Sequence, residues 1–337
     1  MYTFEVKKIP FYIFMFIIVL LFSTFGKHVK EYFKKQTEDD EYELIRKYLL
    51  NDTSLYGNNK PKLWIHSKYE RNSRVWKSFT SRHSYDLNQP YIHITIKSII
   101  DHCGDDFNIC LIDDNSFSKL IPLWNIKINL LPESDKKKVR EYGMLSLLHV
   151  YGGMIVPNSF ICFENLKKLY DIGISQQTPF ICENNNNTMN VKEKERMFVP
   201  DIFFMGVEKK ENSTIQEIIN IVKKSCDDPH KTCEDEFTGN LNTYLLLLIK
   251  LNKIILIGGE IIGIKTASNE KILLDNLMEE EEIELHLKCC GIYIPNDEIL
   301  KRIKYQWFAL LSSEEIMKSN SILCRYLKLS IQENPIH

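Results

Sequence analysis

Tyr151-Gly152-Gly153-Met154-Ile155-Val156-Pro157-Asn158-Ser159-Phe160 is the stretch that decides the fold of this chain. Ahead of it, apolar and aromatic residues recur at helical spacing over 139–150 and predict a helix. The two glycines end that helix, because glycine accepts the left-handed conformation of a helix C-terminus. The β-branched pair after Met154 favours a buried strand, and the proline stops it because it lacks a ladder donor. Asn158 and Ser159 are therefore expected at a strand end.

Two further apolar stretches, 62–66 and 107–112, predict strands, and 92–102 between them predicts a helix. Ligands of open parallel sheets lie outside the carboxyl ends of the strands. The first strand ends at His66, and the second is followed by Asp113 and Asp114, which could bind a cation or a nucleotide hydroxyl. The alternative is that Asp114 or Asn115 caps a helix over 117–120. The pattern predicts an α/β fold of the Rossmann type.

These motifs resemble glycosyltransferases of the GT-A fold, in which a helix runs into Gly-Gly-Ile-Tyr-Leu-Asp-x-Asp. The two aspartates of that family form the DXD motif, which holds a divalent cation against the diphosphate of a nucleotide sugar. Gly152 and Gly153 match, whereas Pro157 and Ser159 fall at the positions of the aspartates. The helix of that family also carries Asp-x-x-Arg. Here those positions hold Glu141 and Met144, so that the acid is kept and the arginine is not.

The chain is more similar to a divergent branch of this superfamily from large DNA viruses, in which Gly-Gly-Met-x-Val-Pro-x-Ser-Phe replaces the metal motif. The matching stretches are 61–66, 87–91, 112–114, 152–160 and 305–308. The resemblance implies a GT-A-like nucleotide-sugar domain and assigns no catalytic residue. It implies that a shared set of side chains lines the donor cleft: His66, Asp113, Asp114, Glu141, Asn158 and Ser159.

Metal binding is in question because hard cations need oxygen ligands, preferably charged ones. Proline supplies no side-chain oxygen, and serine and asparagine supply only neutral ones. No metal ligand is therefore assigned. A divalent cation could bind only through ligands other than the usual pair, and no cofactor is certain.

The composition excludes one class of partner. The 337 residues are 44% hydrophobic and carry a formal net charge of -2, whereas nucleic-acid binders cluster Lys and Arg. The expected partners are a nucleotide sugar and a glycan or glycoprotein acceptor, and no nucleic acid. Nine cysteines are an odd number, which does not establish an oxidising compartment.

The N-terminal part predicts a membrane anchor. Residues 9–26 form an uncharged apolar run, long enough to span a bilayer and without a convincing cleavage site. A signal peptide or a buried helix is the alternative. We expect a transmembrane anchor over 1–26, a charged stem over 27–60 and the GT-A-like domain over 61–337. This organisation predicts a single-pass membrane protein, located in host endomembranes or the virion if the chain is viral.

The leading hypothesis is transfer of a sugar from a nucleotide-sugar donor to a glycan or protein acceptor. The second hypothesis is a GT-A-like binding or virion-associated structural protein that has lost catalysis. Fold alone does not decide between them. Whether the chain is an enzyme stays open at this point.

Overall fold

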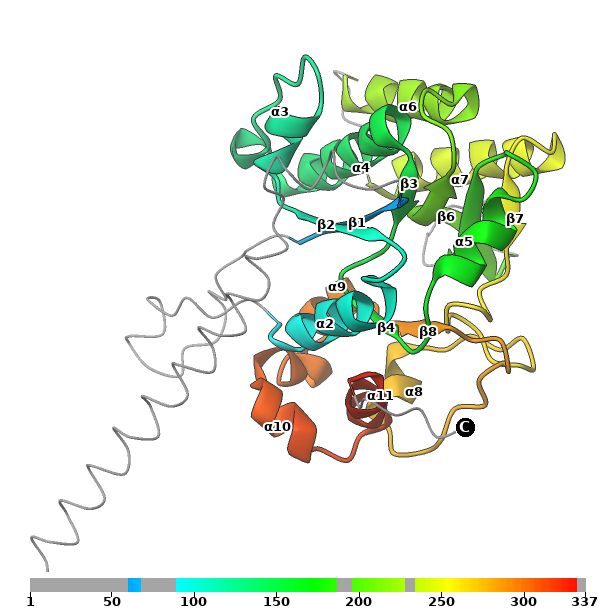
Figure 1. Ribbon diagram of the computed structural model, residues 1–337. Helices are drawn as coiled ribbons and strands as arrows, with labels where there is room; N and C mark the ends of the chain where they lie inside the picture. The colour runs from blue at the N-terminus through cyan, green and yellow to red at the C-terminus, as the bar shows by residue number, and fades with distance from the viewer. Residues whose placement is uncertain (1–59, 68–88, 187–195, 228–233, 332–337) are drawn as a thin grey trace, which may run out of the picture. The chain divides into compact units, whose positions relative to one another are not determined.

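A mixed six-stranded sheet forms the centre of the structure, a computed structural model that describes residues 60–67, 89–186, 196–227 and 234–331 (Figure 1). The strand order is β2-β1-β3-β6-β5-β7. Its members are β1 (Lys62–His66), β2 (Asn108–Ile112), β3 (Gly153–Ile155), β5 (Phe180–Asn185), β6 (Phe198–Val207) and β7 (Ile255–Ile257). The predicted strands at 62–66 and 107–112 are confirmed as β1 and β2.

The directions of the strands make this an α/β fold with a mixed sheet. β1 pairs in parallel with β2 on one side and with β3 on the other. β6 runs antiparallel to both β3 and β5, and β7 runs parallel to β5. The carboxyl ends of β1, β2, β3, β5 and β7 consequently share one edge with the start of β6. From β1 the chain first adds β2 on one side of that strand and later adds β3 on its other side. The strand order of the sheet therefore reverses between β1 and β3.

Contacts within the chain separate 1–47 from 48–337, and every described residue belongs to the second unit. The predicted anchor over 1–26 lies outside the described residues, as does the predicted stem except for its last residue, Lys60. Among the helices that can be described, none is long and apolar enough to cross a membrane.

The glycine corner forms as the sequence predicts. Helix α4 (Glu133–Tyr151) ends at Gly152, which has φ 71° and whose amide donates to the Leu148 carbonyl at 2.8 Å. Gly153 has φ 100°, and a Cβ atom there would lie 2.1 Å from the Lys62 carbonyl oxygen. Glycine is therefore required both by the backbone conformation and by the close approach of β1.

Helix α4 begins before the predicted residue 139 and includes Lys136 to Lys138. Three consecutive lysines in the sequence predict a solvated helix start, which is wrong for Lys138 because this residue is 2% exposed. Its Nζ lies 5.6 Å from the centre of the Phe237 ring, so the aliphatic stem is packed among apolar groups.

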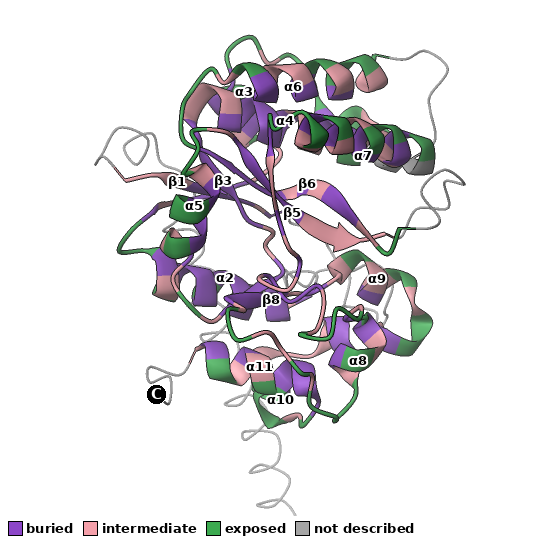
Figure 2. Ribbon diagram, turned by 90° about the vertical axis from the view of Figure 1, so that its right-hand side faces the viewer, coloured by how far each residue is buried: buried purple, intermediate pink, exposed green. Residues whose placement is uncertain are grey.

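Helices cover both faces of the sheet. α4, α6 (Ser213–Cys226) and α7 (Glu234–Lys250) form one layer, and α5 (Lys167–Ile174) lies on the opposite side (Figures 1 and 2). Phe117, in the short helix α3 (Ser116–Leu120), packs into the same apolar core as residues of α4, α6 and α7. Asn212 caps α6 by accepting hydrogen bonds from the amides of Thr214 and Ile215. Apolar residues at helical spacing thus point inward from each helix.

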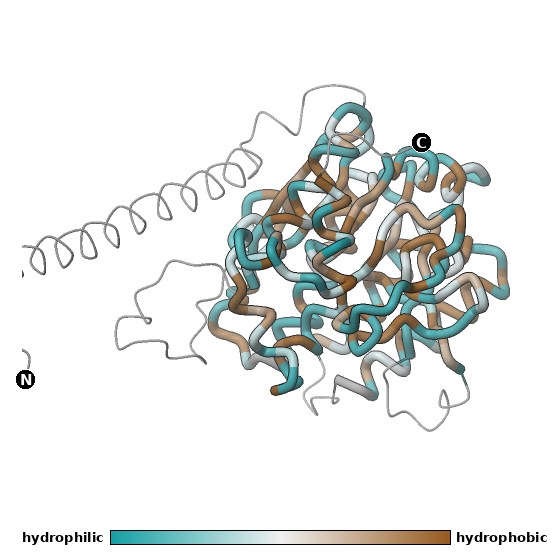
Figure 3. The backbone as a smooth tube through the Cα atoms, turned by 90° about the horizontal axis from the view of Figure 1, so that it is seen from below, coloured by the Kyte–Doolittle hydropathy of each residue, from teal (hydrophilic) through white to brown (hydrophobic). Residues whose placement is uncertain are grey.

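A second group of elements packs below the sheet in Figure 2, including α2 (Tyr91–Cys103) and a small antiparallel sheet of β4 (Phe160–Cys162) and β8 (Gly291–Tyr293). The C-terminal elements complete this group: α8 (Leu274–Met278), α9 (Asn296–Lys301), η6 (Ile303–Tyr305), η7 (Phe308–Leu310), α10 (Ser313–Lys318) and α11 (Ile322–Ser330). A short 3-10 turn, η4 (Ile128–Leu130), precedes α4. Hydrophilic segments lie mainly on the outside of the described part (Figure 3).

Some local predictions are confirmed and others are wrong. The capping box of Ser312 and Glu315 is present, and the predicted helix over 92–102 is α2. Pro295 is typical of the first turn of a helix, and the sequence predicts one helix from there to Leu310, but the structure has α9, η6 and η7 in its place. Gly258 and Gly259 within the apolar stretch 254–266 predict a hairpin of two strands, but the structure describes one strand there, β7, which pairs with β5. The acidic stretch 226–240, which contains Pro229 and Gly239, predicts a long irregular loop, but the structure describes a helix from Glu234 onward.

Candidate functional site

The candidate site begins with His66 at the carboxyl end of β1. Its side chain lies on the same face of the strand as Trp64, since alternate residues share a face. The imidazole stacks on the Phe117 ring, with centroids 5.5 Å apart and an interplanar angle of 8°. His66 therefore has a fixed ring plane at the edge where the sheet reverses its strand order.

Asp114 follows β2 and joins His66 to Arg140 of α4. Its Oδ1 lies 2.9 Å from His66 Nε2 and 2.9 Å from Arg140 Nε, and its Oδ2 lies 2.7 Å from the terminal nitrogen Nη2 of Arg140. The side chains of His66, Asp114 and Arg140 are only 14%, 16% and 15% exposed, which limits the screening of their charges by water. We call this group the His66–Asp114–Arg140 cluster.

The charge state of Asp114 follows from these contacts. Burial alone would raise its pKa, but the hydrogen bonds from Arg140 and His66 outweigh burial and hold the pKa well below its ordinary range. The carboxylate is therefore ionised and can only accept hydrogen bonds, so Nε2 of His66 must carry the hydrogen that it shares with Asp114. The cluster presents a fixed carboxylate at the carboxyl edge of the sheet.

Asp113 has a local structural role. Its Oδ1 accepts hydrogen bonds from the Ser116 amide at 2.9 Å and the Ser116 hydroxyl at 2.7 Å. The predicted cap of this helix by Asp114 or Asn115 is wrong, and Asp113 instead binds the amide of the first residue of α3. Asn115 makes no side-chain cap bond, and Asp114 is bound to Arg140. Asp113 lies beside the cluster without joining it.

Asn158 and Ser159 follow β3 at the same edge and make contacts outside the cluster. The backbone carbonyl of Asn158 accepts a hydrogen bond from the Thr95 hydroxyl of α2. Ser159 is 1% exposed, and its hydroxyl donates to the Ile294 carbonyl at 2.8 Å. These bonds attach the exit of β3 to α2 and to the residue after β8. The Ser159 hydroxyl is thus part of the core.

Glu141 follows Arg140 on α4, and its negative charge acts on the end of α6. Burial raises the pKa of Cys226 to about 11, and the negative charges of Asp227 and Glu141 add to this effect. Cys226 is the last residue of α6, so Glu141 lies toward the end of that helix. The structure brings His66 and Asp114 together with Arg140, the residue before Glu141.

Arg140 is the residue that sequence reasoning missed. The resemblance places the arginine of the family at the position of Met144. This chain instead has an arginine one residue before Glu141. A helix leading into the strand beside β1 must begin near the carboxyl edge. A basic residue near its start was therefore the available signal.

A second polar group lies farther along the same edge, at the ends of β5 and β7. Lys265 Nζ is 2.7 Å from Glu183 Oε2 and 3.2 Å from Glu260 Oε2. The Gly259 amide donates to Glu183 at 3.0 Å. These contacts neutralise the lysine with two carboxylates and fix the turn after β7.

Asp201 and Asn184 lie between these two groups, where β6 begins and β5 ends. Asn184 Nδ2 donates to Asp201 Oδ2 at 2.8 Å. The pairing of β5 with β6 is irregular here, because Ile181 faces Met205 while Cys182 faces Asp201. The ring of Phe203, from the intervening residues of β6, lies 4.7 Å from that of Tyr293.

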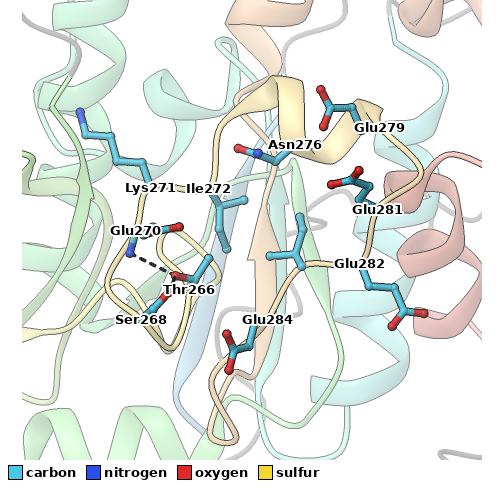
Figure 4. A pocket seen from close by; sticks show the side chains of 11 residues that line it. Thr266, Ser268, Glu270, Lys271, Ile272, Asn276, Glu279, Glu281, Glu282 and Glu284 are labelled. Atoms are coloured by element: carbon cyan, nitrogen blue, oxygen red, sulfur yellow. Dashed lines mark hydrogen bonds between the residues drawn. The ribbon is translucent and has the colours of Figure 1, made fainter.

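An acidic pocket of about 210 Å³ is found elsewhere, within the segment between β7 and β8. Two stretches of the chain line it, one with Thr266, Ser268 and Glu270 and the other with Glu279, Glu281 and Glu282 (Figure 4). Its carboxylates come from Glu270, Glu279, Glu281, Glu282 and Glu284. None of the predicted site residues lines this pocket.

No group of three or more His, Cys, Asp or Glu side chains suited to a metal ion occurs in the described ranges. The fold and its edge define an α/β domain with a mixed six-stranded sheet. Comparison with protein-family models, with curated proteins and with solved structures found no match.

Proposed function

We propose that this domain binds a nucleotide sugar outside the carboxyl ends of β1 and β3 and transfers the sugar to a glycan or protein acceptor. The resemblance of the 152–160 corner to GT-A glycosyltransferases suggests the reaction. The topology supports the location, because ligands of open α/β sheets bind where the strand order reverses. Here that point lies between β1 and β3.

The observation that carries the proposal is the position of Asp114. In nucleotide-binding α/β folds an acidic residue near the end of the second strand accepts hydrogen bonds from the ribose hydroxyls. Asp114 follows the strand next to β1 and is held ionised by His66 and Arg140. Each carboxylate oxygen has more than one lone-pair site, so a ribose hydroxyl can be added to the existing bonds. In this proposal Asp114 positions the nucleoside.

The transferred sugar and its acceptor would lie farther along the edge, toward Asp201. Carboxylate and amide groups bind sugar hydroxyls, and aromatic rings can contact the apolar faces of sugars. Asp201 and Asn184 supply the polar groups, while Phe203 and Tyr293 supply the rings. The start of β6 adjoins β3, so these residues lie on the acceptor side of the proposed nucleotide site.

The reaction joins an acceptor hydroxyl oxygen to the anomeric carbon of the sugar while the bond from that carbon to the diphosphate oxygen breaks. The main task is electrostatic stabilisation of the diphosphate as it leaves. The metal ligands of the family are replaced by Pro157 and by Ser159, whose hydroxyl is bound to Ile294. We therefore expect donor affinity to change little when a chelator removes divalent cations.

Titration calorimetry with uridine, guanosine and cytidine nucleotide sugars, with and without EDTA, tests the proposal. Asp114→Asn should weaken binding by roughly 10- to 100-fold, because hydrogen bonds to charged groups contribute about 1.5–3 kcal/mol. Glu217→Gln is the matched control, since Glu217 lies on the surface of α6 and its carboxylate binds Lys253. Failure of every nucleotide sugar to bind the unchanged protein would refute the proposal. A large increase in affinity with Mn²⁺ would refute only metal independence.

One observation favours the alternative of a binding or structural protein without catalysis. The Ser159 hydroxyl, one of the polar groups implied by the resemblance, is bound to the Ile294 carbonyl inside the core. An inactive relative could still bind a nucleotide sugar. Product analysis by mass spectrometry therefore separates the two functions: binding without transfer or hydrolysis supports the alternative.

A further inference from the structure

Two buried cysteines face each other below the central sheet. The Sγ atoms of Cys103 and Cys162 lie 3.9 Å apart, and both side chains are 0% exposed. The Cys162 thiol also donates to the Glu164 carbonyl at 3.1 Å, and Cys110, Cys289 and Cys290 donate to backbone carbonyls as well. Among the described residues, Cys103 and Cys162 are the pair whose sulfur atoms lie in close contact.

The fold holds this pair together through the backbone. Cys103 is the last residue of α2, and Cys162 is the last residue of β4. The amide of Cys162 donates to the Ser98 hydroxyl of α2 at 3.0 Å, which fixes the strand against the helix. A disulfide bond is about 2.05 Å long, so the sulfurs must approach by roughly 2 Å. The bond would form by rotation of the two side chains, with Cys162 giving up its hydrogen bond to the Glu164 carbonyl.

The pKa values of the two thiols are shifted in opposite directions. The side-chain contact with Cys162 lowers the pKa of Cys103, whereas burial raises the pKa of Cys162. The thiolate is the nucleophile in thiol–disulfide exchange. Cys103 is therefore the better attacking group, and Cys162 is placed to complete the bond.

We propose that Cys103 and Cys162 form a disulfide when the chain folds in the presence of a small-molecule disulfide such as oxidised glutathione. The Cys103 thiolate attacks one sulfur of the oxidant, forming a mixed disulfide and releasing one glutathione thiolate. The Cys162 thiolate then attacks Cys103 Sγ, and the second glutathione thiolate leaves. The protein loses two protons and two electrons, and the oxidant is reduced to two thiols. Because both cysteines are buried, the exchange takes place during folding or local opening.

The closed loop would be long. The two cysteines are 59 positions apart, and loops of this length give a substantial stabilisation on cross-linking. The cross-link would join α2 to β4, and thereby fix the part of the fold where Thr95 contacts Asn158. We expect the oxidised protein to melt roughly 5 to 15 °C above the reduced protein.

The test uses the full chain refolded in detergent buffer with reduced and oxidised glutathione. After refolding, free thiols are blocked under denaturing conditions and proteolytic peptides are identified by mass spectrometry. A cross-linked peptide containing Cys103 and Cys162 is expected. Cys103→Ala and Cys162→Ala should each abolish that peptide and the difference in melting temperature between oxidised and reduced protein. Cys110→Ala, the matched control, should retain both.

Recovery of Cys103 and Cys162 as blocked thiols after oxidative refolding would overturn the proposal. Cross-linking of Cys103 to a different cysteine would also overturn it. The peptide map of the unchanged protein gives this answer even if an alanine variant does not fold. The result is independent of whether the domain binds a nucleotide sugar.

Discussion

The glycine corner gives a sharp prediction about stability, because Gly153 is required for two separate reasons. In Gly153→Ala the alanine backbone must adopt φ 100°, a conformation that costs an L-residue about 1–2 kcal/mol. The added Cβ would lie 2.1 Å from the Lys62 carbonyl oxygen and 2.9 Å from its carbonyl carbon. These are backbone atoms of β1 and cannot rotate away. Forcing β1 and β3 apart adds about 1–3 kcal/mol of overpacking.

The expected loss is therefore about 2–5 kcal/mol, a large part of the usual stability of a domain. Thermal unfolding should show a decrease of roughly 5 to 15 °C. Gly259→Ala is the matched control, because its nearest neighbours are side-chain atoms of Ile264 at 3.0 Å and 3.2 Å. We expect the control to lose much less stability. If Gly153→Ala melts within about 1 °C of the unchanged protein, β3 cannot lie against β1 as described.

Two predictions concern pH. The lowered pKa of Asp114 means that its contacts stabilise the fold fully above the unfolded value of about 4, and that this stabilisation is lost as pH falls through the lower folded value. Urea unfolding between pH 6 and pH 3 should consequently depend less on pH in Asp114→Asn, and an unchanged pH dependence would contradict the cluster. Burial lowers the pKa of His93 to about 4, so the unfolded state binds its proton more readily and stability should fall as pH falls from about 6.5 to 4. The change is at most about 3 kcal/mol by linkage, and His93→Gln should remove it from the measured profile. A decline of equal size in the variant would assign the effect to other groups.

The elements that the sequence predicted well are those specified by short-range signals. The turn at Gly152 and Gly153 depends on backbone conformations that glycine adopts readily. β1 is a short apolar run bounded by Pro61, and the capping box at Ser312 involves residues only three positions apart. These patterns are complete within a few residues, so they can be interpreted without knowledge of the tertiary structure.

The elements that were missed depend on distant parts of the chain. The direction of β6 is set by its pairing with β3 and β5, and its apolar run contains no signal for that choice. Lys138 belongs to a charged run, yet the packing of Phe237 buries it. The pattern gave reasons to consider His66 and Asp114 separately, but their contact with Arg140 requires β1, β2 and α4 to meet at one edge. Tertiary packing supplied that information.

The charges of the cluster also suggest which part of a nucleotide it would hold. Arg140 binds both oxygens of Asp114, and His66 binds one of them. A diphosphate placed on Arg140 would compete with Asp114 and would bring two anions together in a site that water screens weakly. A ribose hydroxyl has no such cost, because it donates a hydrogen bond to the carboxylate and adds no charge. The cluster therefore suits the nucleoside end of the proposed donor, and the diphosphate would lie farther along the edge, toward the exit of β3. Loss of Asp114 should accordingly weaken binding of a nucleoside and of its diphosphate sugar by similar factors, whereas a cluster that bound the diphosphate would affect only the second.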